Sequence, residues 1–99
     1  MDTARPVTAG LTRHAQVRMQ QRGIGADVLE DLLAYGRAVH DHRGAQIVFF
    51  DRAARRQLAE EQGGEALRRL GKRLSAYAVI GAEGEVRTVG HRIRRIHRH

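Results

Sequence analysis

Residues 37–58 read RAVHDHRGAQIVFFDRAARRQL, and this stretch decides the fold. Arg37–Asp41 is a short extended run, and Ala45–Phe50 is rich in β-branched and aromatic residues. The turn at residues 42–44 joins them into an antiparallel hairpin. Because Ala45–Phe50 is the most apolar stretch of the chain, we expect it to be a central strand. Asp51 then stands at an N-cap position and predicts a helix directly after the hairpin.

Two amphipathic helices are predicted upstream of this hairpin. The first lies within Leu11–Ile24, LTRHAQVRMQQRGI, where Thr12 can cap its start. Gly23 suits the left-handed residue that ends such a helix, with the next residue folding back in a Schellman-type stop. The second helix runs from about Ala26 to Tyr35, and its apolar residues repeat at helical spacing: Val28, Leu29, Leu32 and Leu33.

The downstream half of the chain predicts more helix and a second hairpin. Gly63-Gly64 interrupts the helix that follows Asp51, and a second piece is expected over Glu65–Leu74. Two further strands, Ala76–Ile80 and Val86–Val89, are joined by a turn that suits a hairpin. The fold class is therefore α+β: two N-terminal helices, an antiparallel sheet of about four strands, and a helical insertion between two hairpins. We expect a leader at residues 1–10, one domain at 11–92 and a basic tail at 93–99.

Charge is the most informative property of the composition. The 99 residues carry 18 Lys and Arg against 11 Asp and Glu, giving a net charge of +7 and a pI of about 11.4. Such a balance predicts a polyanionic partner, nucleic acid first, although a GC-rich genome, which increases the use of arginine, would produce the same excess. Without cysteine the chain has no disulfide and no thiolate metal site. No window approaches the ~20 apolar residues of a membrane span, so we expect a cytoplasmic protein without a membrane partner.

Four clusters of histidine and arginine could carry chemistry. Residues four apart share one face of a helix, which places His14, Arg18 and Arg22 on a single stripe of the first helix. These groups repel one another unless an anion lies across them. The second cluster spans the first turn and consists of His40, Asp41, His42 and Arg43. The third lies at the end of the last strand and consists of Thr88, His91 and Arg92. The fourth is in the tail and consists of Arg94, Arg95, His97, Arg98 and His99.

The clusters together predict cleavage of RNA without a metal or other cofactor. Such cleavage needs two groups that move protons near neutral pH and cations that stabilise the charge on phosphorus. We assign His14 or His40 as the base and His91 as the acid. Thr88 is a further catalytic candidate, and the candidate phosphate-binding residues are Arg18, Arg22, Arg43, Arg92, Arg94 and Arg95.

Three other interpretations of the same residues stay open. The arginine stripe could be a solvated basic face, and each histidine could have a purely local role. The pairs His40-x-His42 and His97-x-His99, with Asp41, have a spacing that zinc or copper tolerates. The protein could also bind nucleic acid without cleaving it. In that case an aromatic stacking platform is not expected, because all four aromatic residues occupy core-like positions in the pattern: Tyr35, Phe49, Phe50 and Tyr77.

Three segments resemble a known family. Residues 14–24, HAQVRMQQRGI, and 88–92, TVGHR, together with the middle segment 40–58, resemble a bacterial family of domains of unknown function. That family opens on a His-Ala-x-x-Arg-Met-x-x-Arg-Gly-Ile helix and later carries a strand ending in Thr-Val-x-His-Arg. Its pattern is similar to that of RelE/BrnT-like toxins, within a wider group that includes barnase-like ribonucleases. The resemblance covers about residues 11–95.

The resemblance implies a small sheet with N-terminal helices and a basic face that cleaves RNA, free or on the ribosome. It also implies an acidic antitoxin encoded nearby. By position, His14, Arg18, Thr88 and His91 match the residues suspected of activity in such folds. The chain departs from RelE by the long helical segment interrupted at Gly63-Gly64 and by the absence of an obvious glutamate base in its strands.

Overall fold

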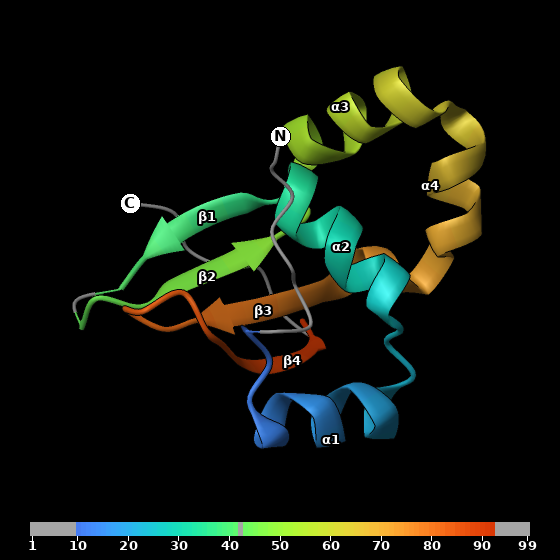
Figure 1. The fold of residues 1–99 in the computed structure, drawn as a ribbon. Coiled ribbons are helices and arrows are strands. Elements are labelled where there is room, and N and C mark those ends of the chain that lie inside the picture. Colours follow the sequence, from blue (N-terminus) through green and yellow to red (C-terminus); the bar gives the residue numbers. More distant parts are fainter. Residues whose placement is uncertain (1–9, 42, 93–99) are drawn as a thin grey trace.

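The structure is a computed structural model that describes residues 10–41 and 43–92. It confirms the α+β class, with four α-helices and a four-stranded antiparallel sheet in the described residues (Figure 1). In chain order the elements are α1 (Arg13–Arg22), α2 (Ala26–Tyr35), β1 (Arg37–His40), β2 (Gln46–Phe49), α3 (Arg52–Gln62), α4 (Gly64–Leu70), the 3₁₀ helix η2 (Gly71–Ser75), β3 (Ala76–Ile80) and β4 (Val86–His91). The predicted site residues His42, Arg94 and Arg95 lie outside the described residues, as do His97, Arg98 and His99.

The sheet is a simple meander in which each strand pairs with the next along the chain. The order is β1-β2-β3-β4, so β2 is an interior strand, as predicted. At one end of the sheet a single register joins all four strands: Arg37 pairs with Phe49, Phe49 with Tyr77, and Tyr77 with Gly90. We call this set the transverse row. It crosses the strands at the end where β1 begins, β2 ends and β4 ends.

Two predicted boundaries were wrong. The last strand continues past Val89 to His91, because His91 still pairs with Ala76 of β3. The second helical piece is α-helical only to Leu70. Gly71 has a φ of 52° there, a left-handed value that glycine adopts easily, and the chain goes on as 3₁₀ helix to Ser75.

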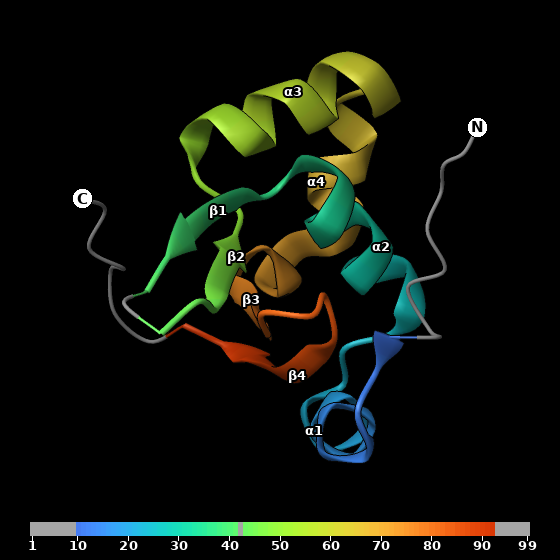
Figure 2. The same ribbon diagram turned by 60° about the vertical axis from the view of Figure 1, so that its left-hand side comes forward.

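The helices gather on one face of the sheet and build the core against it. Figure 2 shows α2, α3 and α4 on the same side, with α1 beside β4. The core face of the sheet carries Val48, Ala76, Ala78 and Val89, all in one buried cluster with residues of the helices. Strand alternation places the transverse row on the opposite face, together with Val39, Ile47, Val79 and Thr88. We call this opposite face the outer face; none of its residues belongs to the core cluster.

A bulge in β4 decides which of its residues reach the outer face. Ile80 pairs with Val86 and Val79 pairs with Thr88, so Arg87 is an extra residue in the ladder. The extra residue lets Val86 and Val89, three apart, both lie in the core. Thr88 therefore lies on the outer face, and His91, three residues further on, lies on the core side.

Across residues 10–41 and 43–92, no helix combines the length and the apolar character that a membrane crossing requires.

Candidate nucleic-acid interface

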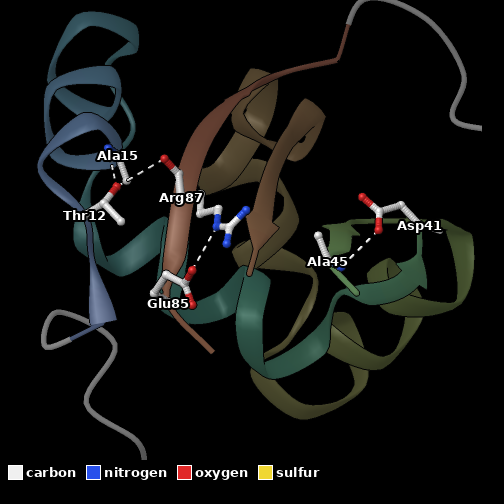
Figure 3. A network of polar contacts seen from close by, with 6 residues as sticks. All are labelled: Thr12, Ala15, Asp41, Ala45, Glu85 and Arg87. Atoms are coloured by element: carbon white, nitrogen blue, oxygen red, sulfur yellow. Dashed lines mark hydrogen bonds and ion pairs between the residues drawn. The ribbon is translucent and has the colours of Figure 1, made fainter. Parts of the chain in front are cut away.

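Helix α1 lies along β4 and is attached to the strand at both ends. At its start the Thr12 hydroxyl accepts from the amide of Ala15 at 3.1 Å, which confirms the predicted cap, and donates to the carbonyl of Arg87 at 3.2 Å (Figure 3). The amide of Thr12 also donates to the carbonyl of Val86 at 3.0 Å. The start of the helix is therefore fixed beside the start of β4.

The other end of α1 is fixed by a glycine stop and by a histidine. Gly23 has a φ of 65°, and the amide of Ile24 donates to the carbonyl of Met19 at 2.9 Å, which confirms the predicted Schellman-type stop. The Nε2 atom of His91 lies 3.3 Å from the carbonyl oxygen of Arg22. Because a carbonyl only accepts, Nε2 must carry the proton in this contact.

The basic stripe lies on the flank of α1 that leads to the outer face. Ala15 and Met19 turn toward the core, and both are buried. His14, Arg18 and Arg22 follow one another along the neighbouring flank, as the spacing predicted. The Nε of Arg18 donates to Nε2 of His14 at 3.5 Å, at the limit of a hydrogen bond. The structure therefore brings His14 and Arg18 together, and Arg22 follows one turn further along the same flank.

Gly90 receives the side chain of Arg22. A Cβ atom at Gly90 would lie 2.6 Å from Nη1 of Arg22 and 3.0 Å from Cε1 of Tyr77, both closer than ordinary contacts. The guanidinium group and the tyrosine ring thus share the space above Gly90, which only the missing side chain leaves free. Two segments far apart in sequence, the first helix and the last strand, meet on the outer face at this point.

Arg92 lies at the same end of the sheet, two residues after Gly90. Its guanidinium carbon is 5.1 Å from the centroid of the Phe49 ring, a cation–π distance, and its Nη2 donates to the carbonyl of Phe50 at 3.2 Å. Burial and, next, the positive charge of Arg55 lower the pKa of Arg92, while the carboxylate of Asp51 raises it. Arg92 is therefore a partly buried cation with a second guanidinium group near it.

Two of the predicted histidines lie away from the outer face. His91, the predicted acid, has Nδ1 2.8 Å from the Ser75 hydroxyl in addition to its contact with Arg22, so both ring nitrogens are engaged. His40, the alternative base, pairs with Gln46 at the far end of β1. That end is about 10 Å from the transverse row, since three residues of strand span roughly this length. Neither side chain therefore lies on the outer face with the Arg22 guanidinium and the Tyr77 ring.

Thr88 and Arg43 complete the predicted residues that the structure describes. Thr88 is half-buried on the outer face, one alternation step along β4 from Gly90. Arg43 lies in the exposed turn between β1 and β2, where Asp41 accepts from the amide of Arg43. Asp41 also accepts from the amide of Ala45 (Figure 3). The turn is at the His40 end of the sheet, so Arg43 is separated from the transverse row.

The prediction of core-like positions for the four aromatic residues is confirmed except at Tyr77. Phe50 and Phe49 are buried, although Phe49 lies on the outer side of the sheet, and Tyr35 packs against the core cluster while its hydroxyl donates to Glu61 at 3.0 Å. Tyr77 is half-buried on the outer face. Tyr77 is a candidate site residue that the sequence interpretation missed. The signal was present, because Tyr77 alternates with two small core residues, Ala76 and Ala78, and must face the opposite side.

Neither metal-binding patterns nor relatives add to this site. Within residues 10–41 and 43–92, no group of three or more His, Asp or Glu side chains is arranged to hold a metal ion. No family model matches the chain, and no curated protein or solved structure matches it. The function is therefore argued from the geometry of the outer face.

Proposed function

We propose that this protein binds RNA on the outer face of its sheet and cleaves it, as an endoribonuclease of the toxin type. The observation that supports the proposal best is the meeting of Arg22 and Tyr77 above Gly90. It joins the two segments on which the family resemblance rests. It also brings a cation to the ring of Tyr77, at the end of the sheet where Arg92 lies over Phe49.

The reaction we propose is transesterification within the RNA. The 2′-oxygen attacks phosphorus while the bond from phosphorus to the 5′-oxygen breaks, leaving a 2′,3′-cyclic phosphate and a 5′-hydroxyl. The proton of the 2′-hydroxyl passes to a base, and the departing 5′-oxygen receives a proton from an acid. The charge that develops on the phosphoryl oxygens lies against the guanidinium of Arg22. The groups involved are the RNA, protein side chains and solvent water, which takes up the proton of the 2′-hydroxyl.

Tyr77 is the residue we assign to proton transfer at the phosphate beside Arg22. Its hydroxyl can donate or accept, and its ring lies beside the Arg22 guanidinium. His14, exposed and in contact with Arg18, lies eight residues from Arg22, about 12 Å along the helix, so we assign it to a neighbouring part of the RNA rather than to the cleaved bond. Tyr77 thus takes the role that the sequence interpretation gave to His91, while Arg92 and Arg18 bind phosphates that flank the cleaved bond.

The test is cleavage of total RNA by the pure protein in EDTA. We expect Arg22→Ala and Tyr77→Phe each to reduce the rate by about 100-fold, the usual loss when one proton-transfer or charge-stabilising group is removed. Arg56→Ala, an exposed arginine of α3, is the matched control and should leave the rate unchanged. Cleavage that survives both outer-face substitutions would contradict the proposed site.

A second candidate is a nucleic-acid-binding module that does not cleave. The engagement of both His91 ring nitrogens favours it, because that residue cannot serve as acid without leaving Ser75 and Arg22. In this case wild-type protein binds RNA in a salt-dependent manner, and intact RNA is recovered after long incubation.

The proposed function also includes a protein partner and a cellular location. An acidic antitoxin would cover the basic outer face and exclude RNA from it, and both proteins would act in the bacterial cytoplasm. Inducing this chain in cells should stop growth, and co-expression of the acidic protein encoded beside it should restore growth. Continued growth on induction of an Arg22→Ala variant would connect the effect to the outer face.

A further inference from the structure

Three arginines gather at the other end of the transverse row from Gly90. Arg37 begins β1, Arg92 lies over Phe49 of β2, and Arg55 reaches the same corner from the first turns of α3. We call these three residues the corner cluster. The corner cluster shares no residue with the meeting of Arg22 and Tyr77 above Gly90. One of its members, Arg55, comes from α3, which packs on the core side of the sheet.

Backbone carbonyls hold two of the three guanidinium groups in place. Arg92 donates to the carbonyl of Phe50 at 3.2 Å, and Nη2 of Arg55 donates to the carbonyl of Leu74 at 3.4 Å. These carbonyls lie where β2 ends and where β3 is about to begin. A carbonyl accepts a hydrogen bond but carries no net charge, so the contacts position the arginines without neutralising them.

Asp51 is the carboxylate that faces the cluster. Its Oδ1 accepts from the amide of Ala54 at 2.8 Å, and its Oδ2 lies 3.8 Å from Nη1 of Arg37. Within residues 10–41 and 43–92, this one carboxylate, which also caps a helix, lies near Arg37 and Arg92, so positive charge is in excess at this corner. The lowered pKa of Arg92, caused by burial and by Arg55, agrees with this excess. The Nε of Arg92 is also buried without a hydrogen-bond partner.

We infer that the corner cluster is a second phosphate site, and that a single RNA strand crosses the outer face from Arg22 to this corner, across the direction of the β-strands. The inference rests on the proposed RNA binding, not on cleavage. Gly90 on β4 and Phe49 on β2 are two strand spacings apart, about 10 Å. Groups at that separation contact different phosphates, so the ligand is an oligonucleotide with at least two phosphates rather than a mononucleotide.

The experiment measures binding of a 2′-O-methyl uridine octamer, which has no free 2′-hydroxyl and cannot be cleaved by transesterification. Fluorescence anisotropy compares wild-type protein with Arg22→Ala, Arg55→Gln and the double variant. Glutamine removes the charge of Arg55 and keeps a donor for the Leu74 carbonyl. Arg56→Gln is the matched control, because Arg56 is the exposed neighbour of Arg55 on α3.

We expect each single outer-face or corner variant to weaken binding about 10-fold, as loss of one charged contact does. The double variant should lose about 100-fold, because separate phosphates contribute independently. Arg56→Gln should change affinity less than twofold. Each lost contact should also flatten the dependence of log affinity on log salt by about 0.7, the single-strand value per phosphate.

Three results would overturn the second site: wild-type protein that does not bind the octamer, Arg55→Gln that binds like Arg56→Gln, or a double variant no weaker than either single one. Thermal unfolding of Arg55→Gln distinguishes a role in RNA binding from a purely structural role. A purely structural role would lower the Tm and leave the affinity for the octamer unchanged. The outcome is distinct from that of the cleavage assay. If the variants lose affinity as expected but the wild-type protein does not cleave RNA, the second phosphate site is supported and the endoribonuclease proposal is rejected. If the wild-type protein cleaves RNA but Arg55→Gln binds the octamer like wild-type protein, the endoribonuclease proposal stands and the second site is rejected.

Discussion

The guanidinium of Arg22 occupies the position that a side chain at Gly90 would fill, 2.6 Å from where its Cβ would stand. Helix α1, near the start of the chain, thus packs against β4, near its end, with the Arg22 guanidinium lying over Gly90. Because Gly90 is not among the glycines with a positive φ, its backbone conformation does not itself require glycine. What it provides is space, and the occupant of that space is a cation on the outer face.

Substituting Gly90 is therefore a way to move Arg22 without removing its charge. We predict that Gly90→Ala displaces the guanidinium and lowers RNA affinity about 10-fold, close to the loss in Arg22→Ala, since both remove one charged contact. The free energy of unfolding should fall by about 1 kcal/mol, because the flexible end of Arg22 moves at little cost but the Tyr77 ring, 3.0 Å from the new Cβ, must shift as well. Anisotropy and urea denaturation measure the two quantities.

Gly64→Ala is the control for that experiment. A Cβ at Gly64 meets nothing within 4 Å, and Gly64 is the exposed first residue of α4. RNA affinity should be unchanged in this variant. A Gly90→Ala protein that binds RNA like Gly64→Ala would show that the position of Arg22 does not matter for binding.

The salt dependence of binding distinguishes arginines on the transverse row from those elsewhere. Arg37→Ala should reduce the slope of log affinity against log salt by about 0.7, since one phosphate contact on a single strand is lost. Arg43→Ala should leave the slope as it is, because Arg43 lies in the turn at the opposite end of the sheet. Equal effects of the two substitutions would mean that RNA is attracted by net charge alone and follows no defined path.

The sequence was sufficient for every element whose signal is local. Thr12, Gly23 and Asp51 act within three or four residues of themselves, so their caps and stops could be predicted. The stripe of His14, Arg18 and Arg22 was predictable for the same reason, because a helix of known span fixes which residues share a flank.

The candidate site was only partly predictable, because it depends on how separate elements dock. The grouping of Thr88 with His91 ignored the phase of the strand: three residues along a strand reach opposite faces. The bulge at Arg87 then decided that Thr88 faces outward. The meeting of Arg22 with Tyr77 required the packing of α1 along β4, and no local pattern in either segment encodes that distance.

Stability should depend on pH through Glu85. Its hydrogen bond from Nε of Arg87 at 2.8 Å, and bonds from backbone amides, lower the pKa of this carboxyl below its ordinary value of 4.5 (Figure 3). A carboxyl whose pKa is lower in the folded state contributes stability above its unfolded pKa, and the contribution disappears as the pH falls through the folded value. We therefore expect Glu85→Gln to have a lower Tm than wild-type protein at pH 7 and a converging Tm at low pH. Curves that stay parallel over the whole pH range would assign the effect of the substitution to packing rather than to charge.

His91 should be a structural residue, and two substitutions can show it. His91→Ala removes the contacts to Ser75 and to the Arg22 carbonyl, so α1 loses an attachment to β4 and the protein should be destabilised by about 1–2 kcal/mol. His91→Gln cannot take part in acid–base catalysis, but its amide nitrogen can still donate to the Arg22 carbonyl. If His91 only positions α1, the glutamine variant keeps most of the RNA-cleaving activity and recovers part of the lost stability. If His91 is the proton donor that the sequence interpretation assigned, both variants lose activity alike, and the assignment of proton transfer to Tyr77 has to be abandoned.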